Sequence, residues 1–251
     1  MSNSLMLAGA RAKIERAVHH LADLQVAVQG FREAHPNLIV RDTDSEGAEK
    51  VFRTDLPEIP IEWSMMLGDC VHNLRTAFDH VICAAVRLNG KTPTDKTTFP
   101  ISNCPVREYE PFARSRVEGT SQAVLDLVIR SQPYLGGREP FQIIHSLDVT
   151  DKHNAIIPVW ARFSDVQVFR IVAGRFTHIM TGNNVAVHPG QNPEIGRMTD
   201  SSGGDHYFQF AFDIAFAKRG IAGGKPVIPT LLELAQLTQE TVDIFDRNIF
   251  S

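Results

Sequence analysis

The sequence has few cysteines and none of the spacings that usually hold a metal. Cys70, Cys83 and Cys104 are the three in 251 residues, and no two of them form a CxxC pair or a zinc-type spacing. An odd number without such a pattern excludes a disulfide scaffold and indicates reduced thiols in the cytoplasm. A chain of this length can bury a sizeable core without staples, and it suits one large domain or two small ones.

Long apolar runs and an excess of positive charge are also missing. Residues 1–6 are too few and too polar for the apolar core of a secretion signal, and no stretch approaches the length of a membrane span. The sequence therefore predicts a cytoplasmic protein with no membrane partner. The formal net charge of -4 argues against broad, sequence-blind phosphate binding, which uses a surplus of Lys and Arg. A local basic patch remains open.

The spacing of apolar residues predicts six helices and two β-rich regions. Apolar residues recur at threes and fours over 5–34, 61–88, 107–117, 121–131, 138–151 and 230–249. Alternation at 37–43 and 49–54 predicts a small hairpin. The β-branched and aromatic runs of 155–216 predict one antiparallel sheet of four or five strands. We expect the last helix to open at Thr230, because Glu233 stands three residues later in a capping-box spacing.

These elements predict an α+β fold. A helical bundle at the N-terminus is expected to precede an antiparallel sheet, which is inserted before a C-terminal helix. The chain then divides into a helical region with the small hairpin, 1–154, and a region of sheet plus C-terminal helix, 155–251. The C-terminal helix is expected to pack back on the bundle.

The most informative stretch is GDCVHNLRTAFDH, residues 68–80, because a helix through it has two unlike faces. Leu67, Val71, Leu74, Phe78 and Ile82 share one side, as a packed helix requires. The other side is polar but holds no Lys or Glu, the residues that usually cover a solvated helix face. This composition predicts a polar interior or a functional site.

Three side chains of this polar side, His72, Arg75 and Asp79, project within about 60° of one another. Asp79 can therefore orient either the imidazole of His72 or the guanidinium of Arg75. An imidazole beside a carboxylate has the raised pKa that is useful to an acid/base group. We expect these three side chains to be mostly buried or to face a cleft.

The residues Arg75-Thr-Ala-Phe-Asp-His80 resemble the signature of HEPN-type helical domains, an Arg followed after four to six residues by a His. Many HEPN domains are metal-independent ribonucleases that act as dimers. The resemblance implies RNA as the partner, a homodimer, and no cofactor. It also implies that Arg75 holds the scissile phosphate and that His80 acts on the 2′-hydroxyl or the leaving oxygen, assisted by Asn73 and Asp79.

A second resemblance covers roughly residues 60–155. HNLRTAFDH, the later Phe99-Pro100, Gln132-Pro133 and LDVTDKHN from Leu147 are similar to a set of uncharacterised bacterial proteins with an HNLRSALDH-like helix and a DKHR-like element. This chain departs from that pattern at Asn154, where the set has Arg. The departure removes one candidate phosphate ligand.

Two alternatives to the ribonuclease remain open. A helix through LDVTDKH would place His and Asp side chains opposite those of residues 68–80, and a mixed His/carboxylate set could bind Zn, Mn or Fe as the cofactor of a hydrolase. That set is His72, Asp79, His145, Asp148 and His153. His/Asp pairs in bundles are also common as hydrogen-bonded struts, which would make the chain a non-enzymatic binding protein. Both alternatives predict that the two polar clusters lie side by side.

Overall fold

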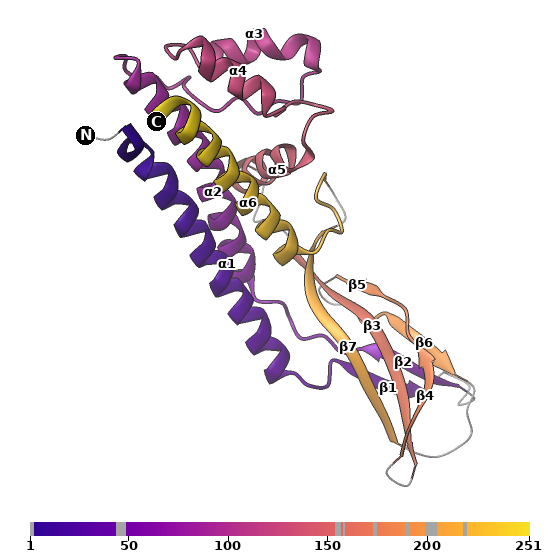
Figure 1. The fold of residues 1–251 in the computed structure, drawn as a ribbon. Coiled ribbons are helices and arrows are strands. Elements are labelled where there is room, and N and C mark those ends of the chain that lie inside the picture. The colour runs from indigo at the N-terminus through magenta and orange to yellow at the C-terminus, as the bar shows by residue number, and fades with distance from the viewer. Residues whose placement is uncertain are drawn as a thin grey trace.

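The computed structural model describes residues 3–43, 49–153, 157, 159–172, 175–188, 191–198, 205–217 and 220–251. The fold is α+β, with a helical half and a β-rich half at opposite ends of an elongated molecule (Figure 1). Both chain ends lie at the helical end. Of the helices described, none is long and apolar enough to cross a membrane.

Three long helices run side by side through the helical half (Figure 1). They are α1 (Ala8–Ala34), α2 (Ile61–Leu88) and α6 (Val227–Phe245). A 3-10 turn, η1 (Asn3–Leu7), precedes α1, and a π-helical turn, η2 (Asp246–Phe250), follows α6. The observed bounds of α2 are the predicted ones, because Pro60 before it and Asn89-Gly90 after it are local stop signals.

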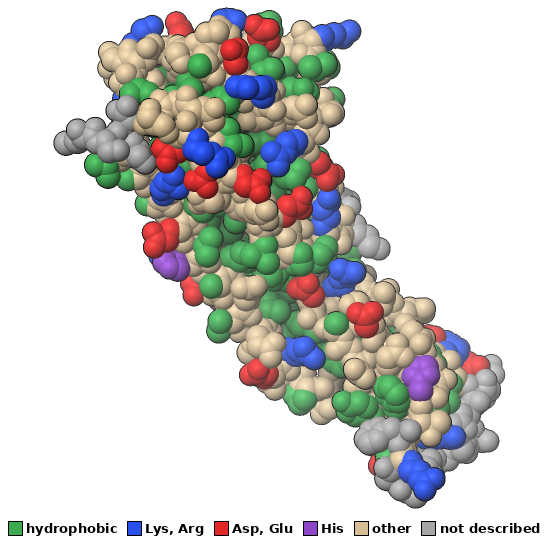
Figure 2. Space-filling view, viewed as in Figure 1, with side chains coloured by type: hydrophobic (Ala, Val, Ile, Leu, Met, Phe, Trp, Pro, Cys, Tyr) green, Lys and Arg blue, Asp and Glu red, His purple; other side chains and the backbone are tan. Residues whose placement is uncertain are grey.

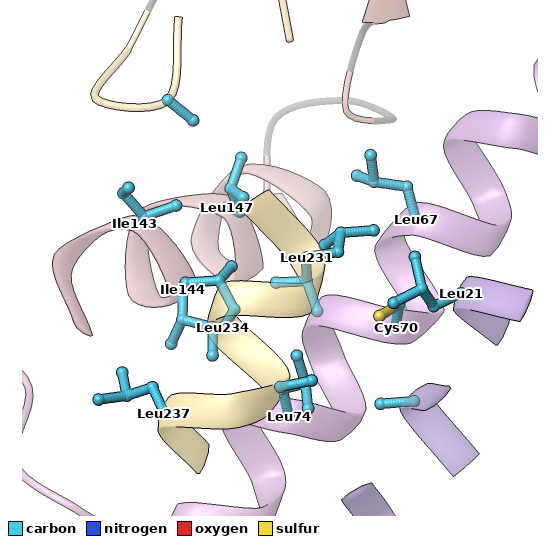
Figure 3. Close-up of a cluster of buried hydrophobic side chains, with 14 of the residues drawn as sticks. Leu21, Leu67, Cys70, Leu74, Ile143, Ile144, Leu147, Leu231, Leu234 and Leu237 are labelled. Atoms are coloured by element: carbon cyan, nitrogen blue, oxygen red, sulfur yellow. The ribbon is translucent and has the colours of Figure 1, made fainter. Parts of the chain in front are cut away.

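Three shorter helices complete the helical half. They are α3 (Val106–Arg116), α4 (Gln122–Arg130) and α5 (Glu139–His153), each within about two residues of its predicted position. Figure 3 shows how α5 joins the bundle: Ile144 of α5 lies beside Leu234 of α6, and Leu147 of α5 and Leu74 of α2 belong to the same buried cluster. All four side chains are buried. This apolar seam fixes α5 beside α2 and so positions the polar residues that flank it.

The strands form two antiparallel sheets. The small sheet has the order β1 (Ile39–Thr43), β2 (Lys50–Thr54), β6 (Glu194–Met198). In the larger sheet β3 (Val159–Val172) pairs with β7 (Asp205–Phe216) on one side and with β4 (Arg175–Thr181) and β5 (Val185–Val187) on the other. The predicted hairpin at 39–54 is confirmed for its two strands, while its turn, 44–48, lies outside the described residues.

The prediction of one sheet over residues 155–216 holds for β3, β4, β5 and β7 and is wrong for β6. β6 leaves its neighbours in sequence and pairs with β2, so the hairpin and β6 make a second sheet. The polar pair Ser164-Asp165 lies inside the long strand β3. A register shift between Ser164 and Gln167, with Asp165 at a φ of 52°, accommodates the polar pair as a bulge within β3.

The predicted start of the last helix is also wrong. α6 begins at Val227, three residues before Thr230, and the hydroxyl of Thr230 donates to the carbonyl oxygen of Pro226 at 2.7 Å. Thr230 therefore lies within the first turn and does not cap it. α6 packs against α1 and α2, so the C-terminal helix does return to the bundle as expected.

Candidate functional site

The polar residues of α2 and α5 lie side by side, which confirms the predicted juxtaposition of the two clusters. Nδ1 of His72 lies 3.0 Å from Oδ1 of Asp148. Lys152, one turn further along α5, donates from Nζ to Oδ2 of the same carboxylate at 2.7 Å. One carboxylate thus holds an imidazole from α2 and an ammonium from its own helix.

Exposure differs sharply within this group. The side chain of Asp148 is 6% exposed, whereas those of His72 and Lys152 are 44% and 43% exposed. An ionised carboxylate only accepts hydrogen bonds, so Nδ1 of His72 is the donor. In the neutral imidazole this leaves Nε2 free of hydrogen and able to accept a proton. The hydroxyl oxygen of Thr76 lies 3.5 Å from Nε2, at the limit of hydrogen bonding.

Asp151 extends the group toward the N-terminal half of α2, where its carboxylate lies directly over Gly68. A Cβ at Gly68 would overlap both oxygens and the carboxyl carbon, so only glycine allows this approach. Burial raises the pKa of Asp151, and the neighbouring charges of Asp148 and Asp69 raise it further, while His72 and Lys152 oppose them. The carboxyl of Asp151 therefore holds its proton to higher pH than an ordinary aspartate.

His145 lies one turn before Asp148 on α5. Its Nδ1 is buried and has no hydrogen-bond partner within the part of the chain that the structure describes. Burial lowers the pKa of His145, and the positive charge of Arg75 lowers it further, against the opposing charges of Asp148 and Asp79. The imidazole of His145 therefore loses its proton at a lower pH than an ordinary histidine does.

Arg75 and Asp79 form a closed unit with the loop that carries Phe99. One terminal nitrogen of Arg75 donates to Oδ1 of Asp79 at 2.6 Å, and the other donates to the carbonyl oxygen of Phe99 at 3.1 Å. The same Oδ1 accepts the N–H of Phe99 at 2.8 Å. With its side chain 10% exposed, Arg75 has both terminal nitrogens engaged in joining α2 to this loop.

The two remaining residues of the predicted catalytic set face α1 instead. Asn73 accepts a hydrogen bond from Nζ of Lys13 at 3.1 Å and donates to the carbonyl oxygen of Asp69 at 2.8 Å. The ring of His80 lies against Gly9, where a Cβ would overlap it. Burial lowers the pKa of His80, and the charge of Lys13 lowers it further.

Arg75 and His80 therefore project in different directions from one helix. Five residues correspond to about 140° around an α-helix, and the two side chains contact different neighbours, the loop at Phe99 and the start of α1. The structure joins Arg75 to Asp79 and His72 to Asp148. It does not bring Arg75 and His80 to a common point.

The five residues of the alternative metal set are only partly assembled. His72 and Asp148 are in contact, and Asp79 is bonded to Arg75 and to Phe99. The side chain of His153 lies outside the described part of the structure. Across the ranges that the structure describes, no three His, Cys, Asp or Glu side chains are grouped so that they could hold a metal ion.

Sequence reasoning missed two participants of this site. One is Gly68, whose signal was present, because a glycine in the interior of a helix costs stability and often marks a close approach. The other is the main chain of Phe99, which donates to Asp79 and accepts from Arg75. Backbone groups are common to all residues, so no side-chain pattern identifies this partner.

Charges of both signs lie on the face of the helical half that Figure 2 shows. Figure 2 shows Lys and Arg interspersed with Asp and Glu over the visible face of the helical half. Comparison with protein-family models, with curated proteins and with solved structures found no match to this chain. The assignment of a function therefore depends on the geometry of the residues themselves.

Proposed function

We propose that the protein cleaves RNA without a metal ion, at the group formed by His72, Asp148, Asp151 and Lys152. The observation that carries this proposal is the half-exposed imidazole of His72, whose Nδ1 is held 3.0 Å from a buried carboxylate. A general base needs both features: a fixed tautomer and access to substrate. The resemblance to HEPN domains suggests RNA as the substrate, whereas this geometry points to a different acid/base residue from the one that the resemblance implies.

Each residue has a distinct task in the proposed reaction. Nε2 of His72 takes the proton of the 2′-hydroxyl, whose oxygen then forms a bond to phosphorus and gives a 2′,3′-cyclic phosphate. The bond from phosphorus to the 5′ oxygen breaks, and the carboxyl of Asp151 supplies the proton that this leaving oxygen needs. The ammonium of Lys152 balances the charge that develops on the phosphate oxygens. Water is not consumed in this step.

Arg75 and Asp79 act as positioning residues in this scheme. They attach the loop at Phe99 to α2 and so maintain the face of α2 on which His72 lies, one turn away. The HEPN resemblance instead assigns contact with RNA to Arg75 and His80, and it implies that two copies pair through α2. Both assignments predict EDTA-resistant cleavage, and they differ in which histidine is required.

The test is cleavage of a fluorescein-labelled single-stranded RNA in EDTA by the wild type and by three variants. We expect His72→Gln to lower the rate about a hundredfold or more, the usual contribution of acid/base groups. His80→Gln should keep most of the activity. His19→Gln, an exposed position on α1, is the matched control and should cleave as the wild type does.

The outcomes distinguish a site at His72 from the HEPN pair and from a metal-dependent hydrolase. Loss of cleavage in His80→Gln with activity retained in His72→Gln would move the site to the HEPN pair. Absence of cleavage by the wild type would refute the ribonuclease proposal. Elemental analysis of the purified protein accompanies the assay, because a stoichiometric transition metal would favour the hydrolase with its His/Asp ligands.

One observation favours a second function, a non-enzymatic binding protein. The bonds of Arg75 to Asp79 and to Phe99 are those of a strut, since they satisfy buried groups and tie a loop to a helix. If the same holds for the pair of His72 and Asp148, the polar contacts between α2 and α5 serve only to fix the register of one helix against the other. A protein that folds normally, cleaves no RNA and holds no metal would support this function.

A further inference from the structure

A cavity of about 490 Å³ lies between the C-terminal end of α1 and strand β7. In Figure 1, β7 lies on the side of the larger sheet that faces this end of α1. A volume of this size suits a small-molecule ligand. We refer to the cavity as the α1–β7 pocket. It is lined by Gln29, Arg32, Glu33, His35 and Pro36 on the α1 side and by Tyr207–Phe210 on the β7 side.

The β7 side of the α1–β7 pocket is rich in aromatic residues. Tyr207 is 49% exposed, and Phe208 and Phe210 are half-buried. The ring of Phe208 lies 5.4 Å from that of Phe52 in the small sheet, and the ring of Phe210 lies 5.5 Å from that of Phe163 in β3. These contacts hold two of the three rings in place. Aromatic residues at a pocket wall favour a ligand with an aromatic side chain.

The α1 side of the pocket carries one charge of each sign. Arg32 is exposed and makes no hydrogen bond or ion pair with any residue that the structure describes. Glu33 accepts a hydrogen bond from Gln29 at 2.7 Å on Oε1, so its charge is not balanced by a cation. A guanidinium binds a carboxylate through two parallel hydrogen bonds, and a carboxylate binds an ammonium. The pocket therefore suits a ligand that carries both charges.

His35 adds a hydrogen-bond acceptor to the same side of the pocket. Its Nδ1 lies 2.8 Å from the carbonyl oxygen of Phe31, and a carbonyl oxygen only accepts, so Nδ1 is the donor. Nε2 of the neutral imidazole is then an acceptor. An ammonium has three N–H donors, which the carboxylate of Glu33 and Nε2 of His35 can both serve.

We propose that the α1–β7 pocket binds a small zwitterion with an aromatic side chain, either a free amino acid or a short peptide with its two charged ends. The carboxylate of the ligand binds Arg32, its ammonium binds Glu33, and its side chain packs on the aromatic wall of β7. A ligand with only one of the two charges leaves one charged side chain of the pocket unmatched. This site is independent of the ribonuclease proposal and involves none of its residues.

Isothermal calorimetry with L-phenylalanine tests the proposal. Two analogues accompany it: 3-phenylpropionate lacks the ammonium, and phenethylamine lacks the carboxylate. We expect L-phenylalanine to bind at least about tenfold more tightly than either analogue, the usual worth of a charged hydrogen bond. The dipeptide L-phenylalanyl-L-phenylalanine separates the two charges along a longer chain, so tighter binding of the dipeptide or of L-phenylalanine identifies which source of the zwitterion fits the pocket.

Two variants assign the two charges. Arg32→Gln should weaken binding of L-phenylalanine about tenfold and leave phenethylamine unchanged, because phenethylamine has no carboxylate. Glu33→Gln should weaken L-phenylalanine to a similar extent and leave 3-phenylpropionate unchanged. Arg16→Gln, exposed on the same helix, is the matched control and should bind as the wild type does. Both pocket positions are exposed, and circular dichroism verifies that each variant is folded.

Three results would overturn the proposal. The first is no binding of L-phenylalanine or of the dipeptide at about 10 mM, where any remaining affinity is worth less than ~3 kcal/mol. The second is equal binding of L-phenylalanine and either analogue, which would show that the pocket does not recognise both charges. The third is unchanged binding of L-phenylalanine in Arg32→Gln or in Glu33→Gln, which would place the ligand elsewhere on the protein.

Discussion

Replacing Arg75 by Ala should destabilise the fold by about 2–3 kcal/mol. The substitution removes the donor to Oδ1 of Asp79 and the donor to the carbonyl oxygen of Phe99. Breaking a buried ion pair typically costs roughly 3–5 kcal/mol, because the other charge is left without compensation. The side chain of Asp79 is 28% exposed and keeps the N–H of Phe99, so water can offset part of that cost.

Urea unfolding followed by circular dichroism measures this change, and a thermal melt should show a midpoint lower by roughly 5–10 °C for a chain of this length. Arg87→Ala, exposed in the last turn of the same helix, is the control and should change stability by less than about 0.5 kcal/mol. The double variant Arg75→Ala/Asp79→Ala should be more stable than the sum of the single losses predicts.

A free energy of unfolding within about 0.5 kcal/mol of the wild type for Arg75→Ala would refute this reasoning. It would mean that the guanidinium is not the tie between α2 and the loop at Phe99. The HEPN assignment, in which Arg75 holds phosphate and carries little of the stability, would then regain support.

Two further predictions concern close approaches and pH. Gly68→Ala should lower the free energy of unfolding by about 1–3 kcal/mol, because the new Cβ displaces Asp151. Gly30 has open space around it, so Gly30→Ala is the control and should raise the free energy of unfolding by about 0.5–1 kcal/mol. Equal shifts in the two variants would contradict the packing argument. The lowered pKa values of His80 and His145 mean that the unfolded chain binds more protons near pH 6, so stability should fall as pH drops below about 6.5. Urea titrations from pH 7.5 to 5.5 test this, and His145→Gln should flatten the slope.

Local signals account for most of the fold that the sequence predicts. The limits of α2 follow from a proline and an Asn-Gly pair beside it, and the hairpin follows from alternation within a few residues. The position of β6 could not be read in this way. Its partner β2 lies more than a hundred residues earlier in the chain, and single-sequence alternation does not specify a partner at that distance.

The same distinction applies to the candidate site. The absence of Lys and Glu on one side of α2 predicts restricted exposure of His72, Arg75 and Asp79. The side chains of Arg75 and Asp79 are 10% and 28% exposed, as expected, whereas that of His72 is 44% exposed and departs from the prediction. Complementary His and Asp residues on two helices predict the contact between His72 and Asp148. Arg75 is held by Asp79 and by the backbone carbonyl of Phe99. The spacing of four residues predicts the contact with Asp79, but no sequence pattern predicts the contact with a backbone atom.

His72 and Arg75 lie one turn apart on α2, yet their removal should have different consequences, and this difference decides between an enzyme and a strut. His72→Gln leaves Asp148 paired with Lys152 and replaces a side chain that is already half-exposed, so the cost in stability should stay below about 1 kcal/mol. Residues retained for catalysis commonly contribute little to stability, or oppose it. Lost RNA cleavage with an unchanged urea midpoint in His72→Gln would therefore identify His72 as catalytic. A destabilisation as large as that of Arg75→Ala would show that α2 and α5 are held together through the imidazole, and it would favour the binding protein.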